Sequence, residues 1–416
     1  MKPTIQYIYG VVLLSFAVLN LQAQTLDDYI KIAAENNPEL KATFNQYLAA
    51  LERVPQVKAL PDPTVMFSIF ASPVETRVGA QQAGISFTQA FPWFGQLRSQ
   101  ANAAEELAKA RFSAFEETKN KLIYDVRSTY YDLYVLEAAV RVTEKNIKLL
   151  ESFREMANIK LESATGSAVD LLRVEMELGE LNNQILYLGD SRLPILTKFK
   201  ELLNTETPPV IQLPDTLATE PLTLTQSVLR DSILAQNPTL AKFEYEILSL
   251  DEEISVAKKM GLPSFSLGLA YTSVAKRPGI EMPDNGKDAL IFPQVGVRIP
   301  LYRSKYKSMV KEREIMQTSV TEEKTSRVNQ LNTMLETTWR DYADAERRIK
   351  LYVRLTNLAT QALDVIVAQY TSAGKDFEEI LRMDRQLLRY ELELEKARAD
   401  QNTTISYLNY LTGKQY

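Results

Sequence analysis

The stretch that decides the fold is residues 264–272, SFSLGLAYT. Large apolar side chains occupy every second position, and Ser, Gly, Ala and Thr fill the positions between them. Since successive side chains of a strand point to opposite faces of its sheet, this alternation predicts a strand with one apolar face and one small or polar face. It extends to about 274 and recurs at about 293–301 and 84–92, and less regularly at 64–72. We therefore expect four such strands.

The length of these runs suits a membrane crossing. Each has about the 9 to 11 residues with which a tilted strand spans a bilayer. A strand of a soluble, half-buried sheet alternates in the same way, so the pattern alone leaves both interpretations open. Aromatic residues at the strand ends, Phe91, Trp93, Phe94 and Tyr271, resemble an interfacial girdle and favour the membrane.

The N-terminus predicts export. Lys2 is followed by an apolar run from Ile8 to Leu19 and by the small residue Ala23, which is the pattern of a signal peptide. The run is shorter than the roughly 20 residues of a spanning helix, so we interpret residues 1–23 as a cleaved signal peptide. No later stretch is long and apolar enough for such a helix, so any crossing of the membrane is expected to be made by strands.

Two long segments without proline or glycine lie at residues 97–163 and 302–372. Their apolar positions recur at spacings of three, four and seven, which is typical of coiled coils. At 1.5 Å per residue, uninterrupted helices of this size reach about 100 Å. A partner helix follows each segment, so we expect two long helical hairpins, at about 97–203 and 302–412.

The order of helix, proline break, two strands and helical hairpin occurs twice. Asn37-Pro38 in the first half corresponds to Asn237-Pro238 in the second. We interpret the chain as an internal duplication, with repeats at 24–204 and 222–416. The Pro-rich link at 205–221 is too polar and too broken to belong to a core. The expected fold class is mainly α with a small transmembrane β part.

Four strands are too few to close a barrel, and an open sheet edge in lipid leaves backbone groups unpaired at several kcal/mol each. Several copies are therefore expected to share one barrel. A barrel of about eight strands, as two copies would form, is filled by side chains. A conducting duct thus favours a homotrimer with a shared 12-stranded barrel. Leu267 and Val297 are expected to face lipid, and Ser266 and Gly296 the lumen.

The composition excludes several kinds of chemistry. The chain has no Cys and no His, so disulfides, thiolate nucleophiles, His-based triads and the usual zinc and copper sites are excluded. A net charge of −5 gives no basic footprint for nucleic acid. Phosphate-binding loops and nucleophile elbows are also missing from the sequence. We expect no enzyme, no cofactor and no metal site.

Two alternatives stay open at this point. A periplasmic coiled-coil scaffold without a pore explains the long helices but not the four alternating runs. An exported hydrolase that uses paired carboxylates is not excluded by composition.

The order of these elements resembles the TolC-type outer-membrane efflux family. Asn36-Asn37-Pro38-Glu39-Leu40 near the mature start and Phe91-Pro92-Trp93-Phe94-Gly95-Gln96 after the second run carry the resemblance, which covers essentially all of the mature chain. It implies a trimer with a 12-stranded barrel in the outer membrane and an α-helical tunnel in the periplasm. It also implies a passive exit duct for substrates delivered by an inner-membrane pump and a periplasmic membrane-fusion adaptor. In this family the pump mainly selects the cargo, so none is assigned.

The resemblance places functional residues at the two hairpin turns, which form the periplasmic tip in this family. Gly166 and Gly374 are expected to supply the left-handed conformation that ends each helix. Glu379 matches a constricting acid of the family, and Arg382 stands where another acid is often found. Such a ring of acids would favour cations, although each acid is alternatively a solvated group on a helix. Further constriction candidates are Asp170 and Glu378. Adaptor contact is implied for Ala164, Thr165, Gly166, Ser167, Ala373, Gly374, Lys375 and Asp376.

Overall fold

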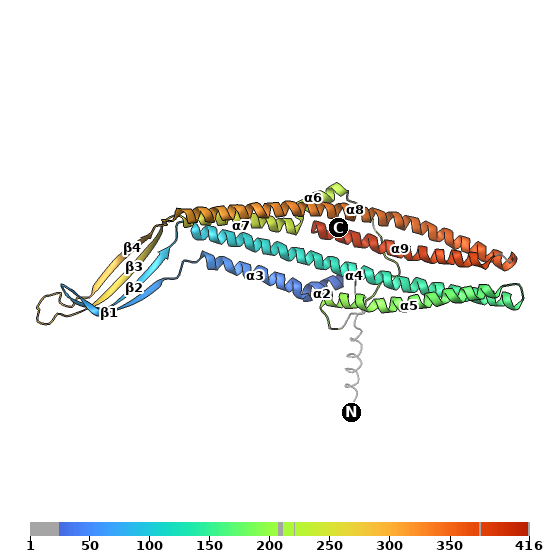
Figure 1. The fold of residues 1–416 in the computed structure, drawn as a ribbon, viewed down its shortest axis with the longest axis horizontal. Coiled ribbons are helices and arrows are strands. Elements are labelled where there is room, and N and C mark those ends of the chain that lie inside the picture. Colours follow the sequence, from blue (N-terminus) through green and yellow to red (C-terminus); the bar gives the residue numbers. More distant parts are fainter. Residues whose placement is uncertain (1–24, 207–210, 220, 374–375, 415–416) are drawn as a thin grey trace, which may run out of the picture. The chain divides into compact units, whose positions relative to one another are not determined.

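The computed structural model describes residues 25–206, 211–219, 221–373 and 376–414. It is mainly helical, and the same order of helix, helix, strand, strand, helix, helix occurs twice (Figure 1). The first series is α2 (Leu26–Asn36), α3 (Pro38–Lys58), β1 (Thr64–Thr76), β2 (Gly79–Phe91), α4 (Gln96–Glu162) and α5 (Ala168–Leu203). The second is α6 (Gln226–Gln236), α7 (Pro238–Met260), β3 (Ser264–Ala275), β4 (Ala289–Arg298), α8 (Arg303–Ala373) and α9 (Phe377–Thr412).

The chain forms two compact units, and each draws on both halves of the sequence. The strand unit consists of Glu39–Thr118 and Ser227–Met334. The hairpin unit consists of the described residues within Met1–Pro38, Lys119–Gln226 and Leu335–Tyr416. Both α4 and α8 contribute residues to each unit. None of the helices in the described parts of the chain combines the length and the apolar character that a membrane span requires.

The Asn-Pro pairs break the chain between two helices in both series, as expected. Asn237 has an extended ψ of 122°, which suits a residue before proline, and its side chain accepts hydrogen bonds from the backbone N–H groups of Thr239 and Leu240. Pro238 then begins α7, where its missing N–H costs nothing. Asn37 has a similar ψ of 124° at the end of α2, and its side-chain amide donates to the Leu202 carbonyl at 3.3 Å.

The strands form one antiparallel sheet in the order β1-β2-β3-β4 (Figure 1). Its register places large apolar side chains on one face and small or polar residues on the other. Phe67 pairs with Ile85, Ile85 with Tyr271, and Tyr271 with Leu290, so a row of large apolar residues crosses one face. On the other face Ser266 pairs with Gly296, and a Cβ added to Gly296 would lie 2.4 Å from the Ser266 hydroxyl. The expected alternation is present, with Leu267 and Ser266 on opposite faces.

Three strands differ from their expected bounds, and the first of them, β1, ends at Thr76 rather than at 72. β2 begins at Gly79 rather than at 84, because a tight turn starts it, with Gly79 at a φ of +140° and the Thr76 hydroxyl donating to the Gly79 carbonyl at 2.7 Å. β4 covers 289–298 rather than 293–301. Its start was missed because residues 290–292 are apolar without alternation, and the register shifts opposite them, between Gly268 and Ala270. Pro300, which lacks a ladder donor, follows its end.

The hairpin unit has its main core where four helix segments meet. Residues from α4, α5, α8 and α9 all contribute, so the two hairpins pack against each other through their apolar seams. Fully buried members are Leu150, Val174, Phe377, Ile380 and Leu381. This core surrounds the ends of the hairpins and fixes the helices that carry the two turns.

The link between the repeats contributes to a core, contrary to expectation. Leu217 is buried in a cluster with Tyr134, Ala138 and Ala399. The Tyr134 hydroxyl accepts a hydrogen bond from the Leu217 backbone N–H at 3.1 Å, so the irregular backbone is satisfied while its side chain is buried. The sequence did not indicate this because prolines and polar residues surround Leu217, the apolar residue of the link that is buried in this cluster.

Candidate functional site

The first hairpin turn reverses the chain between α4 and α5. Ala164, with a φ of +56°, takes the left-handed conformation that was expected for Gly166. The backbone N–H groups of Thr165 and Gly166 both donate to the Lys160 carbonyl at 2.9 Å, which satisfies the end of α4. The expectation for Gly166 was therefore wrong, since Gly166 itself has no positive φ.

Gly166 has a different reason to be glycine. A Cβ built there would lie 2.8 Å from the Lys160 Cβ and 3.1 Å from the Lys160 carbonyl carbon. Real Cβ atoms do not approach neighbouring atoms so closely, so a larger residue has to shift the turn or the last turn of α4. The close approach to Lys160 is the constraint at this position.

Both hairpins restart with a capped helix. The Ser167 hydroxyl accepts a hydrogen bond from the Val169 N–H at 3.2 Å and begins α5. The Asp376 carboxylate accepts one from the Glu378 N–H at 3.0 Å and begins α9. Each cap satisfies one of the helix's orphan donors. Ala373 is the last residue of α8, whereas Gly374 and Lys375 lie outside the described residues, so the expectation for Gly374 stays a prediction.

Lys160 joins the ends of α4 and α8, a contact that sequence reasoning missed. Its ammonium donates to the Tyr370 carbonyl at 2.5 Å and lies 4.4 Å from the centroid of the Tyr370 ring. That ring in turn packs on Phe377 with a centroid distance of 5.1 Å. A Lys in the last turn of a helix commonly binds terminal carbonyls, but nothing in the sequence names a carbonyl of the other hairpin as its partner.

The acids proposed for a constriction have three different surroundings. Asp170 is largely buried, which raises the pKa of its carboxyl, while a backbone hydrogen bond at Ser167 and nearby Arg173 oppose that rise. Glu378 lies between two arginines, 3.2 Å from Arg173 and 3.2 Å from Arg385. Neither is a bare acid facing solvent.

Glu379 and Arg382 are the exposed pair among these candidates. Their side chains are 55% and 58% exposed and lie 3.4 Å apart. An ion pair with this exposure is worth at most about 1 kcal/mol, so the Glu379 carboxylate is free to respond to surrounding ions. The structure of one chain thus brings Asp170 and Glu378 into one network with Arg173 and leaves Glu379 outside it.

Asp384 is the most perturbed acid near the turns, and the sequence analysis did not select it. It is 2% exposed, and its carboxylate accepts a hydrogen bond from the Asn146 side-chain amide at 2.8 Å. Burial raises the pKa of Asp384 to about 7, and the Asn146 hydrogen bond opposes the rise. Glu177 and Glu391 raise it further. The signal was present, because Asp384 lies on the apolar stripe of α9 between Leu381 and Leu387.

The family model of outer membrane efflux proteins matches residues 29–205. This segment of the chain is therefore similar to the outer membrane efflux protein family. It is 22% identical over 262 residues to toxin and drug export protein A of Aggregatibacter actinomycetemcomitans, covering 61% of this chain and 57% of that one. It is 24% identical over 312 residues to the outer membrane efflux protein BepC of Brucella suis biovar 1 (strain 1330), covering 72% and 66%. This chain thus spans less than two thirds of the length of either relative.

Solved structures share the fold of this chain. CusC has a TM-score of 0.77 at 14% identity, covering 94% of this chain and 93% of that one. The open state of the MtrE outer membrane channel of Neisseria gonorrhoeae has a TM-score of 0.74 at 16% identity, covering 94% and 89%. The expected fold of the single chain, long helices with four strands, is confirmed. The relative BepC is named an outer membrane protein, which agrees with the location expected for this chain.

Proposed function

We propose that this chain is the outer-membrane exit duct of an efflux system and that it works as a homotrimer. The observation that carries the proposal is the sheet, which has an exposed apolar face. Among the described residues, its two outer strands, β1 and β4, are each paired on one side only. In lipid, each unpaired backbone group costs several kcal/mol. Three copies joined edge to edge satisfy these groups in a closed 12-stranded barrel wide enough to conduct.

The same proposal gives the long helices their role. They form a periplasmic tunnel under the barrel, which receives substrates from an inner-membrane pump through a periplasmic adaptor. The duct is passive, so no reaction, cofactor or resident metal is assigned to the chain. The residues proposed to contact the adaptor are Ala164, Thr165, Gly166, Ser167, Ala373, Gly374, Lys375 and Asp376.

The mass and conductance of the purified full chain test the duct. In detergent we expect the mass of three chains, and in planar lipid bilayers we expect discrete ion-conducting steps. A stable monomer would contradict the shared barrel. A trimer that never conducts would instead support a coiled-coil scaffold without a pore.

Cysteine cross-linking tests the adaptor contact. Because the chain has no Cys, a single thiol reports on one position. We expect Thr165→Cys, in the exposed first turn, to cross-link to the adaptor encoded beside the partner pump. Asn183→Cys, exposed along α5, is the matched control. Equal cross-linking from both positions would remove the turn from the proposed contact.

The proposed constriction is tested at Glu379, because Asp170 and Glu378 are engaged with arginines. Three copies of Glu379 around the axis would attract cations. We expect Glu379→Gln to lower the cation preference in single-channel recordings without lowering the yield of trimer. Arg382→Gln, which removes the opposite charge one turn away, is expected to raise that preference. Unchanged selectivity in both variants would make Glu379 a solvated helix acid.

A further inference from the structure

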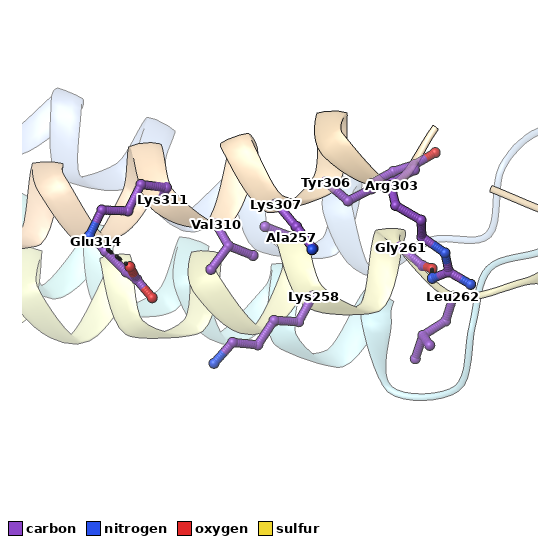
Figure 2. Close-up of a pocket in the computed structure, with 10 residues that line it drawn as sticks. All are labelled: Ala257, Lys258, Gly261, Leu262, Arg303, Tyr306, Lys307, Val310, Lys311 and Glu314. Carbon is purple, nitrogen blue, oxygen red and sulfur yellow. Dashed lines mark hydrogen bonds and ion pairs between the residues drawn. The ribbon is translucent and has the colours of Figure 1, made fainter. Parts of the chain in front are cut away.

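A cavity of about 390 Å³ opens between the last turn of α7 and the first turns of α8, in the strand unit. Four of the side chains around it are cations, and one is an acid (Figure 2). Leu262 and Tyr306 supply apolar surface. The cationic lining residues are Lys258, Arg303, Lys307 and Lys311.

Two of these cations are already used within the chain. Arg303 donates to the Gly261 carbonyl at 2.9 Å, and the Lys311 ammonium lies 3.4 Å from Glu314, as the dashed lines in Figure 2 mark. Lys258 and Lys307 differ, because neither ammonium has a hydrogen bond or ion pair with another described residue. In Figure 2, Lys258 extends from α7 on the side away from α8, and Lys307 reaches from α8 toward Ala257 of α7.

Lys258 and Lys307 are not needed to neutralise the negative C-terminal end of α7. Lys and Arg are favoured near helix C-termini because they interact with the last carbonyls. That role is taken by Arg303 at Gly261, and Lys259 points elsewhere, to the Gly95 carbonyl at 3.2 Å and the Ser99 hydroxyl at 2.7 Å. Lys258 and Lys307 therefore have no structural role at the end of α7.

The cavity lies beside the end of the sheet that carries exposed aromatic and apolar side chains. Leu301 and Tyr302, which directly precede α8, are 75% and 80% exposed. Phe94 is also exposed and packs near Phe265, at the start of β3. Exposed aromatic residues at strand ends are typical of the boundary between hydrocarbon and water. Lipid phosphates lie at the same level.

We propose that this cavity binds the phosphate of an anionic phospholipid of the surrounding bilayer, with Lys258 and Lys307 as its two cationic contacts. Leu262, Leu301 and Tyr302 offer apolar surface to the adjoining acyl chains. A basic pocket next to a hydrophobic span is the arrangement that binds lipid headgroups. This inference rests on the proposal that the sheet lies in lipid.

Native mass spectrometry of the full chain with added lipid tests this site. We expect phosphatidylglycerol to remain bound more often than phosphatidylcholine with the same acyl chains. The double variant Lys258→Gln/Lys307→Gln should lose this preference, with apparent affinity for phosphatidylglycerol falling on the order of tenfold. Lys287→Gln/Lys305→Gln removes the same charge from exposed positions outside the cavity and should keep the preference.

Three outcomes would overturn the inference. Equal retention of phosphatidylglycerol in both double variants would show that the cavity lysines do not hold the lipid. Displacement of the lipid by millimolar inorganic phosphate would make free phosphate the ligand. A lower yield of trimer in the cavity variant, with lipid binding unchanged, would show that another copy of the chain covers the cavity. Trimer mass and conductance of the unmodified protein, measured in parallel, report separately on the proposed function.

Discussion

The sheet and the hairpin core place the same kind of side chain in opposite surroundings. Phe67 and Ile69 in β1 are 76% and 87% exposed, whereas Phe377 and Ile380 at the start of α9 are 1% and 0% exposed. Burying apolar surface contributes about 25 cal/mol per Å². The hairpin core obtains this contribution within one chain, and the sheet does not. The sheet is therefore built for surroundings that the single chain lacks.

The difference follows from the two periods in the sequence. In the helices, apolar residues at spacings of three and four form one stripe, which a neighbouring helix of the same unit covers. In the strands, a period of two places the large apolar residues on one face, and the described part of the chain leaves that face exposed. The predictions below test this contrast, from the largest expected effect to the smallest.

The largest effect is expected for Phe377→Ala. Phe377 packs on Tyr370 inside the core, so its truncation should lower the free energy of unfolding by about 3–5 kcal/mol. Denaturant unfolding followed by helical circular dichroism measures the loss. Phe67→Ala removes an equally large but exposed side chain and should barely change it. Similar decreases in the free energy of unfolding for both variants would show that the core and the sheet do not differ in this respect.

A charge on the sheet should act according to its face. Leu267 shares the apolar face with Val295, and Ser266 lies on the opposite face beside Gly296. Arg at a lipid-facing midplane position costs about 2–4 kcal/mol. We expect Leu267→Arg to reduce the yield of trimer in membranes and Ser266→Arg to have a smaller effect. The assignment of faces is wrong if the two variants assemble equally well.

Asp384 should make the hairpin unit less stable as the pH rises. Because burial raises its pKa from 3.8 to about 7, the folded chain holds this proton more tightly than the unfolded chain does. The corresponding stability is fully present below about pH 4 and is lost as the pH rises through about 7. Asp384→Asn should flatten this dependence and add up to about 4 kcal/mol at alkaline pH.

Unfolding curves recorded across that pH range check the Asp384 prediction. Asp190→Asn, which changes an exposed acid on α5, is the control and should leave the pH dependence as it is. An unchanged slope in Asp384→Asn would show that Asp384 is charged and stabilised in the folded chain.

Two glycines of the hairpin unit should respond to alanine with opposite signs. A Cβ at Gly166 meets Lys160 at 2.8 Å, whereas one at Gly179 in α5 meets nothing within 4 Å. We expect Gly166→Ala to destabilise the unit by about 1–2 kcal/mol through overpacking. Gly179→Ala should stabilise it by about 0.5–1 kcal/mol, because alanine favours the helix. Thermal unfolding gives both signs, and a stabilising Gly166→Ala would mean that the turn relaxes freely.

The sequence predicted the elements well because each carried a strong local period. Long segments without proline or glycine became α4 and α8, and the alternating runs became the sheet. The start of β4 was missed because residues 290–292 do not alternate. At the first turn the glycine was correctly placed but wrongly explained, since Ala164 took the left-handed conformation and Gly166 was needed for its approach to Lys160.

The contacts near the turns were beyond reach for a physical reason. Asn146 and Asp384 are 238 residues apart in the sequence, and Lys160 and Tyr370 are 210 apart. Which residues meet depends on how α4 is aligned along α8 and α9, and a single sequence does not specify that alignment. The position of Asp384 on an apolar stripe indicates that its carboxyl needs a partner, but it does not identify Asn146 as that partner.

Lys160 holds the ends of the two hairpins together through two contacts with one residue, Tyr370. One side chain makes both the hydrogen bond to the Tyr370 carbonyl and the contact with the Tyr370 ring. These contacts are lost together when the ammonium withdraws, and water then solvates the freed charge. Separation of the hairpin ends therefore requires both Lys160 contacts to break together, in addition to the Arg173–Glu378 ion pair between α5 and α9.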